Sequence, residues 1–148
     1  MVDYINLSRT IFSLTEGETD QITLMATIAC EIHHSDSRFD WTGFYRVVEP
    51  DMLKVGPYQG KHGCLSIPFS RGVCGLAAST GKFQLVSNVA ESSDHIACSS
   101  STQSELVIPF WDGAKNLLGV FDIDSDCLDA FTIRDAENIN NILCSVFS

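Results

Sequence analysis

Three of the six cysteines stand in motifs that suit redox chemistry. They are Cys64 in G-C-L-S-I-P-F, Cys74 in R-G-V-C-G and Cys98 in H-I-A-C-S. No two cysteines form a C-x-x-C pair, so the spacing indicates neither a zinc ribbon nor a thioredoxin-type motif. A zinc site built from these three thiols and His62 or His95 stays open as an alternative. The pattern favours a small thiol enzyme that reduces an oxidised small molecule.

Three carboxylates follow in the next two apolar runs. Glu105 opens S-E-L-V-I-P-F, and Asp122 and Asp124 close L-L-G-V-F-D-I-D-S. In a strand Asp122 and Asp124 share a face, and Ile123 points to the other. If Glu105 comes from the adjacent strand, the three acids converge and at least one pKa rises. A carboxyl group protonated near neutral pH can act as a general acid. Alternatively, these acids end their strands in solvent or bind a cation.

An aromatic strand precedes the cysteines. In W-T-G-F-Y, Trp41, Gly43 and Tyr45 share one face, while Thr42 and Phe44 point to the other. Gly43 is expected to leave space between the two rings, which would suit a pocket wall around a methyl-sized group. Packing of the sheet alone is the alternative explanation. The dipole of a helix starting just before Cys74 is expected to lower the pKa of that thiol.

These residues require an α+β scaffold. W-T-G-F-Y-R-V-V has strand composition, E-P-D-M is turn chemistry, and the irregular stretch after Val86 is long enough to be a site loop that carries Cys98. The pattern predicts an antiparallel sheet of about six strands with helices packed on it. The expected helices are 3–15, a second one capped by Thr19 or Asp20, 72–79 and 132–146, and the expected strands are 41–48, 53–58, 64–67, 83–86, 105–111 and 116–124.

Two helices are expected to bury apolar faces. The second helix would use Ile22, Met25, Ala26, Ala29 and Ile32, and the last would use Ile139, Ile142, Leu143 and Val146. The last helix is also expected to start at Thr132 with Asp135 as its capping-box partner. Cys30 and Cys144 lie near these faces and are interpreted as core thiols.

Composition excludes several functions. The chain of 148 residues fits one domain, 1–148, and its net charge of −10 argues against a nucleic-acid partner. No apolar run approaches the ~20 residues that cross a bilayer, and the first residues lack the pattern of a secretory signal. We therefore expect a cytoplasmic protein, and a reducing compartment of this kind keeps cysteines as thiols. Disulfides that form there tend to be transient and catalytic.

Five motifs gain meaning when they are taken together: P-Y-Q-G-K-H-G-C, I-P-F-S-R-G-V-C-G, H-I-A-C, S-E-L-V-I-P and G-V-F-D-I-D-S. As a set they resemble the free methionine-R-sulfoxide reductases, which are built on the GAF fold. The likeness runs from about Trp41 to Phe131, and the order and spacing of all three cysteines and all three acids agree. His62-Gly63 departs from the frequent Pro-Ala of the family, and Ser99 stands where an Asp often follows the nucleophile.

The resemblance implies reduction of free methionine-(R)-sulfoxide to methionine. It implies Cys98 as the nucleophile, Cys64 as the resolving thiol and Cys74 as a second or auxiliary resolver. Glu105, Asp122 and Asp124 would hold the sulfoxide oxygen, and Trp41, with Tyr45 beside it, would contact the methyl group.

Attack by Cys98 would leave a sulfenic acid, which Cys64 converts to a disulfide that an external dithiol such as thioredoxin reduces. No metal or organic cofactor is implied, and a homodimer is a candidate assembly. A non-catalytic GAF module that senses a small ligand is the alternative function, although such a sensor would not need three cysteines set against three acids.

Overall fold

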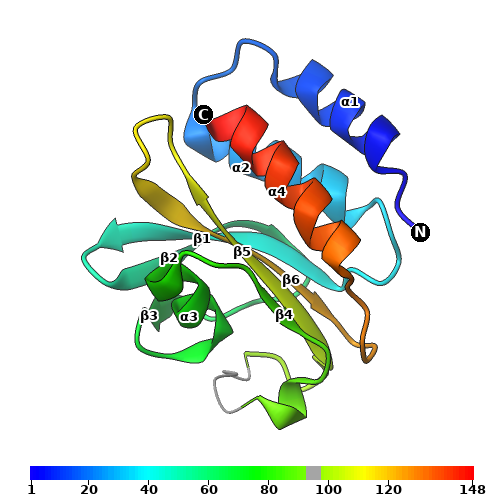
Figure 1. The fold of residues 1–148 in the computed structure, drawn as a ribbon, viewed down its shortest axis with the longest axis vertical. Coiled ribbons are helices and arrows are strands. Elements are labelled where there is room, and N and C mark those ends of the chain that lie inside the picture. The colour runs from blue at the N-terminus through cyan, green and yellow to red at the C-terminus, as the bar shows by residue number, and fades with distance from the viewer. Residues whose placement is uncertain (93–97) are drawn as a thin grey trace.

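The computed structural model describes residues 1–92 and 98–148. The described residues form a six-stranded sheet in the order β3-β2-β1-β6-β5-β4, in which every neighbouring pair is antiparallel (Figure 1). The predicted α+β class is therefore confirmed. The strands are β1 (Trp41–Glu49), β2 (Met52–Gln59), β3 (Ser66–Pro68), β4 (Gln84–Val86), β5 (Ser104–Trp111) and β6 (Leu117–Ser125).

The β1–β2 hairpin forms where the turn chemistry predicted it. Glu49 pairs with Met52, and Asp51 in the two-residue turn takes a φ of 58°. Aspartate tolerates this left-handed conformation because its short polar side chain can bond locally. The strand predicted at 64–67 is shifted, since β3 begins at Ser66 and leaves Cys64 in the preceding loop.

Three helices lie on one side of the sheet (Figure 1): α2 (Gln21–His33) and α4 (Ile133–Phe147) pack on its face, and α1 (Tyr4–Thr15) packs on these two helices. Asp20 caps α2, and Thr132 with Asp135 forms the capping box predicted for α4. Under these helices lies the larger apolar core, which includes Phe44, Phe121 and Ile123 from the sheet. Burial of this face fixes which side chains point to the opposite face.

Part of the predicted helix packing is wrong. Ile22 and Ala26 of α2 are exposed. The buried stripe of this helix is centred on Met25, Ile28 and Ile32. Because a helix turns by about 100° per residue, Ile22 and Ala26 lie at the edge of that stripe. Cys144 is also exposed, and Cys30 is only half-buried. Neither cysteine is a buried core thiol.

The opposite face carries α3 (Gly72–Thr80), which ends at Gly81 in the left-handed conformation (φ 71°) as the glycine predicted. A second, smaller core lies here and includes Trp41, Tyr45, Cys74 and Val120. A short 3₁₀ turn, η1 (Val89–Glu91), precedes the loop that carries Cys98. Every described residue that the sequence marked for chemistry lies on this side of the sheet or in the loops next to it.

None of the helices in the described part of the chain is both long enough and apolar enough to cross a membrane.

Candidate active site

The register of three central strands aligns the acidic residues with Trp41. Asp124 of β6 pairs with Trp41 of β1 on one side and with Glu105 of β5 on the other. Asp122 lies two residues earlier on the same face, while Ile123 is fully buried in the core of the opposite face. The expected convergence of the three acids is therefore confirmed as geometry.

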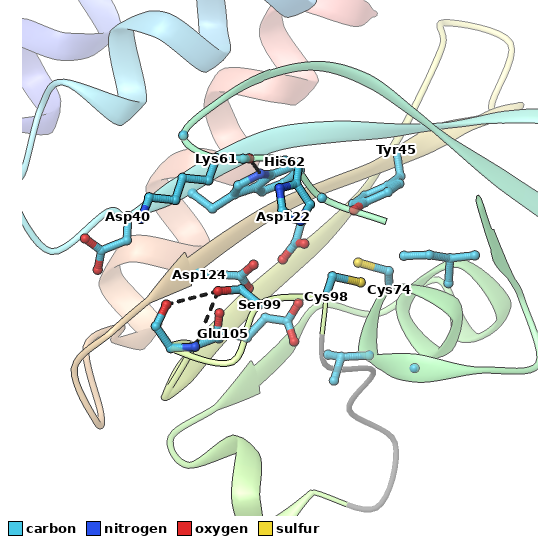
Figure 2. A pocket seen from close by; sticks show the side chains of 18 of the residues that line it. Asp40, Tyr45, Lys61, His62, Cys74, Cys98, Ser99, Glu105, Asp122 and Asp124 are labelled. Carbon is cyan, nitrogen blue, oxygen red and sulfur yellow. Dashed lines mark hydrogen bonds between the residues drawn. The ribbon is translucent and has the colours of Figure 1, made fainter. Parts of the chain in front are cut away.

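A cavity of about 330 Å³ opens above this row. That volume lies at the small end of the range for ligand sites. Figure 2 shows the three carboxyl groups pointing into the cavity, with Cys74 and Cys98 beside them. The predicted site residues that line it are Trp41, Tyr45, Cys74, Cys98, Glu105, Asp122 and Asp124.

Cys64 joins the site through its bond to Cys98. The two cysteines form a disulfide with their Cα atoms 5.4 Å apart, although 34 positions separate them in the chain. Cys64 also packs against the smaller core. The pairing is the one that the family resemblance implied, and Cys74 stays a free, buried thiol.

Burial makes ionisation of the aspartates costly. Asp122 is 4% exposed, and its Oδ1 and that of Asp124 are buried oxygens without a hydrogen-bond partner among the described residues. Loss of hydration, followed by the negative charges of Asp124 and Glu105 and a hydrogen bond to Glu105, raises the pKa of Asp122 well above its usual range. Burial and Glu105 do the same to the pKa of Asp124. The site therefore retains a proton where an isolated carboxyl group would lose it.

The pKa expected for Cys74 was wrong in direction. Cys74 lies in the first turn of α3, but it is buried between this helix and the acids. Loss of hydration, with the charge of Asp122 next in size, raises its pKa well above the usual value. These two effects outweigh the helix dipole. The same causes, burial and then Asp122, raise the pKa of the Tyr45 hydroxyl, so that group stays protonated.

The space expected at Gly43 is filled. The Trp41 ring leans over Gly43 and stacks against two tyrosines, with its centroid 5.7 Å from that of Tyr45 and 5.1 Å from that of Tyr58. A side chain at Gly43 would overlap Tyr58 and the Trp41 ring. Gly43 therefore allows the rings to stack and does not itself form a slot for a methyl group. The aromatic pocket wall is made by Trp41 and Tyr45.

Several polar residues of the cavity were not identified from the sequence. Asp40 and Asp126 lie at its rim, where the backbone N–H of Asp126 donates to Asp40 Oδ2 at 2.7 Å. Their positions directly before Trp41 and two residues after Asp124 were a usable signal. Nothing in the sequence pointed to Lys61, because its place depends on how the loop after β2 folds back. Ser101 and Thr102 line the cavity as well.

One group in the cavity has ligand atoms for a metal ion. Cys74 Sγ and one oxygen each of Glu105 and Asp122 lie within 4.8 Å of one another. Zn²⁺ would require an ionised thiol and ionised carboxylates, whereas burial raises the pKa of both Cys74 and Asp122. The zinc site weighed from the sequence is not formed, because Cys64 and Cys98 are bonded to each other; His95 lies outside the described residues.

The fold and the cavity together define a GAF domain. GAF domain-containing protein A of Dictyostelium discoideum is 38% identical over 140 residues, which cover 95% of this chain and 87% of that protein. No protein-family model matches the chain.

More specific relatives define the family. The free methionine-R-sulfoxide reductase of Escherichia coli K12 is 35% identical over 144 residues, covering 97% of this chain and 86% of the relative. The structure of the Neisseria meningitidis free methionine-R-sulfoxide reductase in complex with its substrate superposes with a TM-score of 0.89 at 36% identity, covering 97% of this chain and 87% of that one. The chain belongs to the GAF-domain family of free methionine-R-sulfoxide reductases.

Proposed function

We propose that this protein reduces free methionine-(R)-sulfoxide to methionine with Cys98 as the nucleophile. The observation that carries the proposal is the convergence of Cys98 with buried carboxyl groups in one cavity of about 330 Å³. Sulfoxide oxygen is a poor leaving group unless it is protonated. A neutral carboxylic acid beside it supplies what the reaction requires.

The acids prepare the substrate for attack. Glu105, Asp122 and Asp124 hold the sulfoxide oxygen, and a carboxyl group whose pKa burial has raised donates its proton to it. The Trp41 ring, with Tyr45 beside it, contacts the methyl group on sulfur. These contacts orient the sulfur atom toward Cys98.

The thiols then carry the oxygen and the electrons. Cys98 attacks the sulfoxide sulfur, methionine leaves, and Cys98 keeps the oxygen as a sulfenic acid. Cys64 attacks that sulfur, the S–O bond breaks, water leaves with the thiol proton, and the Cys64–Cys98 disulfide forms. An external dithiol of the thioredoxin type reduces the disulfide. Cys74 is proposed as the auxiliary resolving thiol.

The test is turnover with separated sulfoxide diastereomers and a dithiol, measured as methionine produced. We expect reduction of the R form only and no reduction by Cys98→Ser. Cys144→Ser is the matched control, because Cys144 is an exposed thiol of α4 on the opposite side of the sheet. A Cys98→Ser variant that keeps its full rate would refute the role of Cys98.

A non-catalytic GAF module remains the second candidate, because the Dictyostelium relative is named for its GAF domain alone. Such a module would bind its ligand without consuming it. Saturable binding of methionine sulfoxide without any methionine formed, under conditions in which Cys98 is shown to be a thiol, would favour that function.

A further inference from the structure

The segment after β2 lies unusually close to the start of β1. A side chain on Gly60, whose φ is +111°, would come within 2.7 Å of the backbone oxygen of Asp40. A side chain on Gly63 would come within 3.0 Å of Trp41 Cζ2 and 3.1 Å of Tyr45 Oη. At Gly60 the positive φ and the overlap with a backbone oxygen require a residue without a side chain, whereas at Gly63 a methyl group would be packed tightly against the two rings. The two glycines therefore mark both ends of a loop that is pressed onto Trp41.

One hydrogen bond fixes the middle of that loop. The indole Nε1–H of Trp41 donates to the backbone oxygen of Lys61 at 2.8 Å. Trp41 is 8% exposed, and its ring stacks against both Tyr45 and Tyr58, so the donor has a fixed direction. In Figure 2 Lys61 and His62 lie across the cavity from Cys98 and Cys74.

Cys64 follows this loop directly. Beyond it, the backbone oxygen of Leu65 accepts a hydrogen bond from the Val55 N–H at 3.0 Å. The backbone of Cys64 is thus held on both sides, by Trp41 through the loop and by β2 through Leu65. These constraints hold Cys64 at a position where its Cα atom lies 5.4 Å from the Cα atom of Cys98.

We propose that Trp41 is a positioning residue for the resolving step: its indole N–H anchors the loop that places Cys64 against Cys98. This role is separate from the methyl contact proposed above, and its catalytic meaning rests on the proposed function. The step it serves is the attack of the Cys64 thiol on the Cys98 sulfenic acid, in which Cys64 is oxidised, the Cys98 sulfur is reduced and water leaves. An anchored thiol reacts at a higher effective concentration than one on a free loop.

The first test does not involve methionine sulfoxide. Wild type, Trp41→Phe and Gly60→Ala are equilibrated in buffers of reduced and oxidised dithiothreitol, the thiols are alkylated, and the Cys64–Cys98 peptide is quantified by mass spectrometry. Trp41→Phe keeps an aromatic ring but removes the donor. We expect its equilibrium constant for the disulfide to fall roughly three- to tenfold, the range that corresponds to the net effect of one hydrogen bond.

Two further variants make this test specific. Gly60→Ala should lower the constant at least as much, because its methyl group would meet the Asp40 backbone oxygen at 2.7 Å and Trp41 Cδ1 at 3.2 Å and so displace the loop, while the indole donor is kept. Trp111→Phe is the matched control, because Trp111 ends β5, lies against Gly81 and does not line the cavity. Its constant should equal that of the wild type.

The second test follows the reaction itself. Reduced protein is mixed with methionine-(R)-sulfoxide and dimedone, and the ratio of trapped Cys98 sulfenic acid to disulfide is measured. This ratio counts only molecules that have already released methionine, so it does not depend on how much Trp41→Phe slows the first step. We expect the ratio to rise roughly three- to tenfold in Trp41→Phe, with any additional disulfide linking Cys74 to Cys98.

Trp41→Phe values within twofold of wild type in both tests would overturn the proposal, even if Gly60→Ala changed them. A wild-type protein that forms no methionine would refute the proposed function alone, since the dithiothreitol equilibrium would still show whether Trp41 positions Cys64.

Discussion

Replacing Asp122 by asparagine should make the protein more stable above neutral pH while it loses activity. The buried Oδ1 of Asp122 has no hydrogen-bond partner among the described residues, and none of the ion pairs found in that part of the chain involves this residue. Asparagine has nearly the same shape and no charge. Its NH₂ group could donate to the carboxylates of Asp124 and Glu105, which now face Asp122.

The sign follows from the raised pKa of Asp122. A carboxyl group whose pKa is higher in the folded state than in the unfolded chain binds more protons when folded. It therefore contributes stability that is present below the ordinary pKa, near 4, and is lost as the pH rises toward the folded-state pKa. Each proton held by the native state alone gives a slope of about 1.4 kcal/mol per pH unit.

Wild type and Asp122→Asn should therefore have similar free energies of unfolding at about pH 4. Above that pH the wild type should lose stability more steeply, and the difference should grow by up to about 1.4 kcal/mol per pH unit until the folded-state pKa is passed. Turnover of the variant should fall about 100-fold or more, the usual effect of removing a general acid.

Urea unfolding of the oxidised proteins between pH 4 and 9 measures this difference. Asp112→Asn is a control of opposite sign, because hydrogen bonds from Asn116 lower the pKa of Asp112. Its stabilising effect is present above the ordinary pKa and is lost as the pH falls, so the control variant should be less stable than wild type at neutral pH. Equal pH slopes for wild type and Asp122→Asn would refute a proton held at Asp122.

Three other changes test separate parts of the structure. Glu105→Gln should lower turnover about 100-fold with the fold retained, as circular dichroism would show, because the residue faces the cavity; an unchanged rate would remove it from the site. Gly119→Ala should lower the free energy of unfolding by about 2–3 kcal/mol in urea, since its methyl group would overlap the backbone oxygen of Tyr45; a loss below 0.5 kcal/mol would contradict this reading of the contact. Cys64→Ser should still release methionine once but recycle slowly, and peptide mapping should find Cys98 as a sulfenic acid or bonded to Cys74; normal recycling would exclude Cys64 as the main resolving thiol.

Local signals in the sequence predicted most of the scaffold. The β1–β2 hairpin, the capping box of Thr132 and Asp135 and the glycine at the end of α3 depend on neighbouring residues, so they could be recognised without a structure. The alternation of Asp122 and Asp124 about Ile123 placed both acids on one face correctly, because side-chain direction in a strand has a strict period of two.

What failed depends on contacts between distant segments. The direction of the Cys74 pKa is set by the acids of β5 and β6 and by burial against them, whereas the sequence showed only the start of a helix. The role of Gly43 depends on where the Trp41 ring turns, and the place of Lys61 depends on a hydrogen bond across 20 positions. Spacing along the chain carries no information about either.

A single turnover without added reductant tests the central claim most directly. The fully reduced protein is freed of dithiol and mixed with excess methionine-(R)-sulfoxide, and methionine, remaining thiols and disulfide-linked peptides are counted. We expect one methionine to be released and two thiols to be lost per chain, and a Cys64–Cys98 peptide to form. A protein that releases no methionine, or that releases it while Cys98 stays a free thiol, would contradict it.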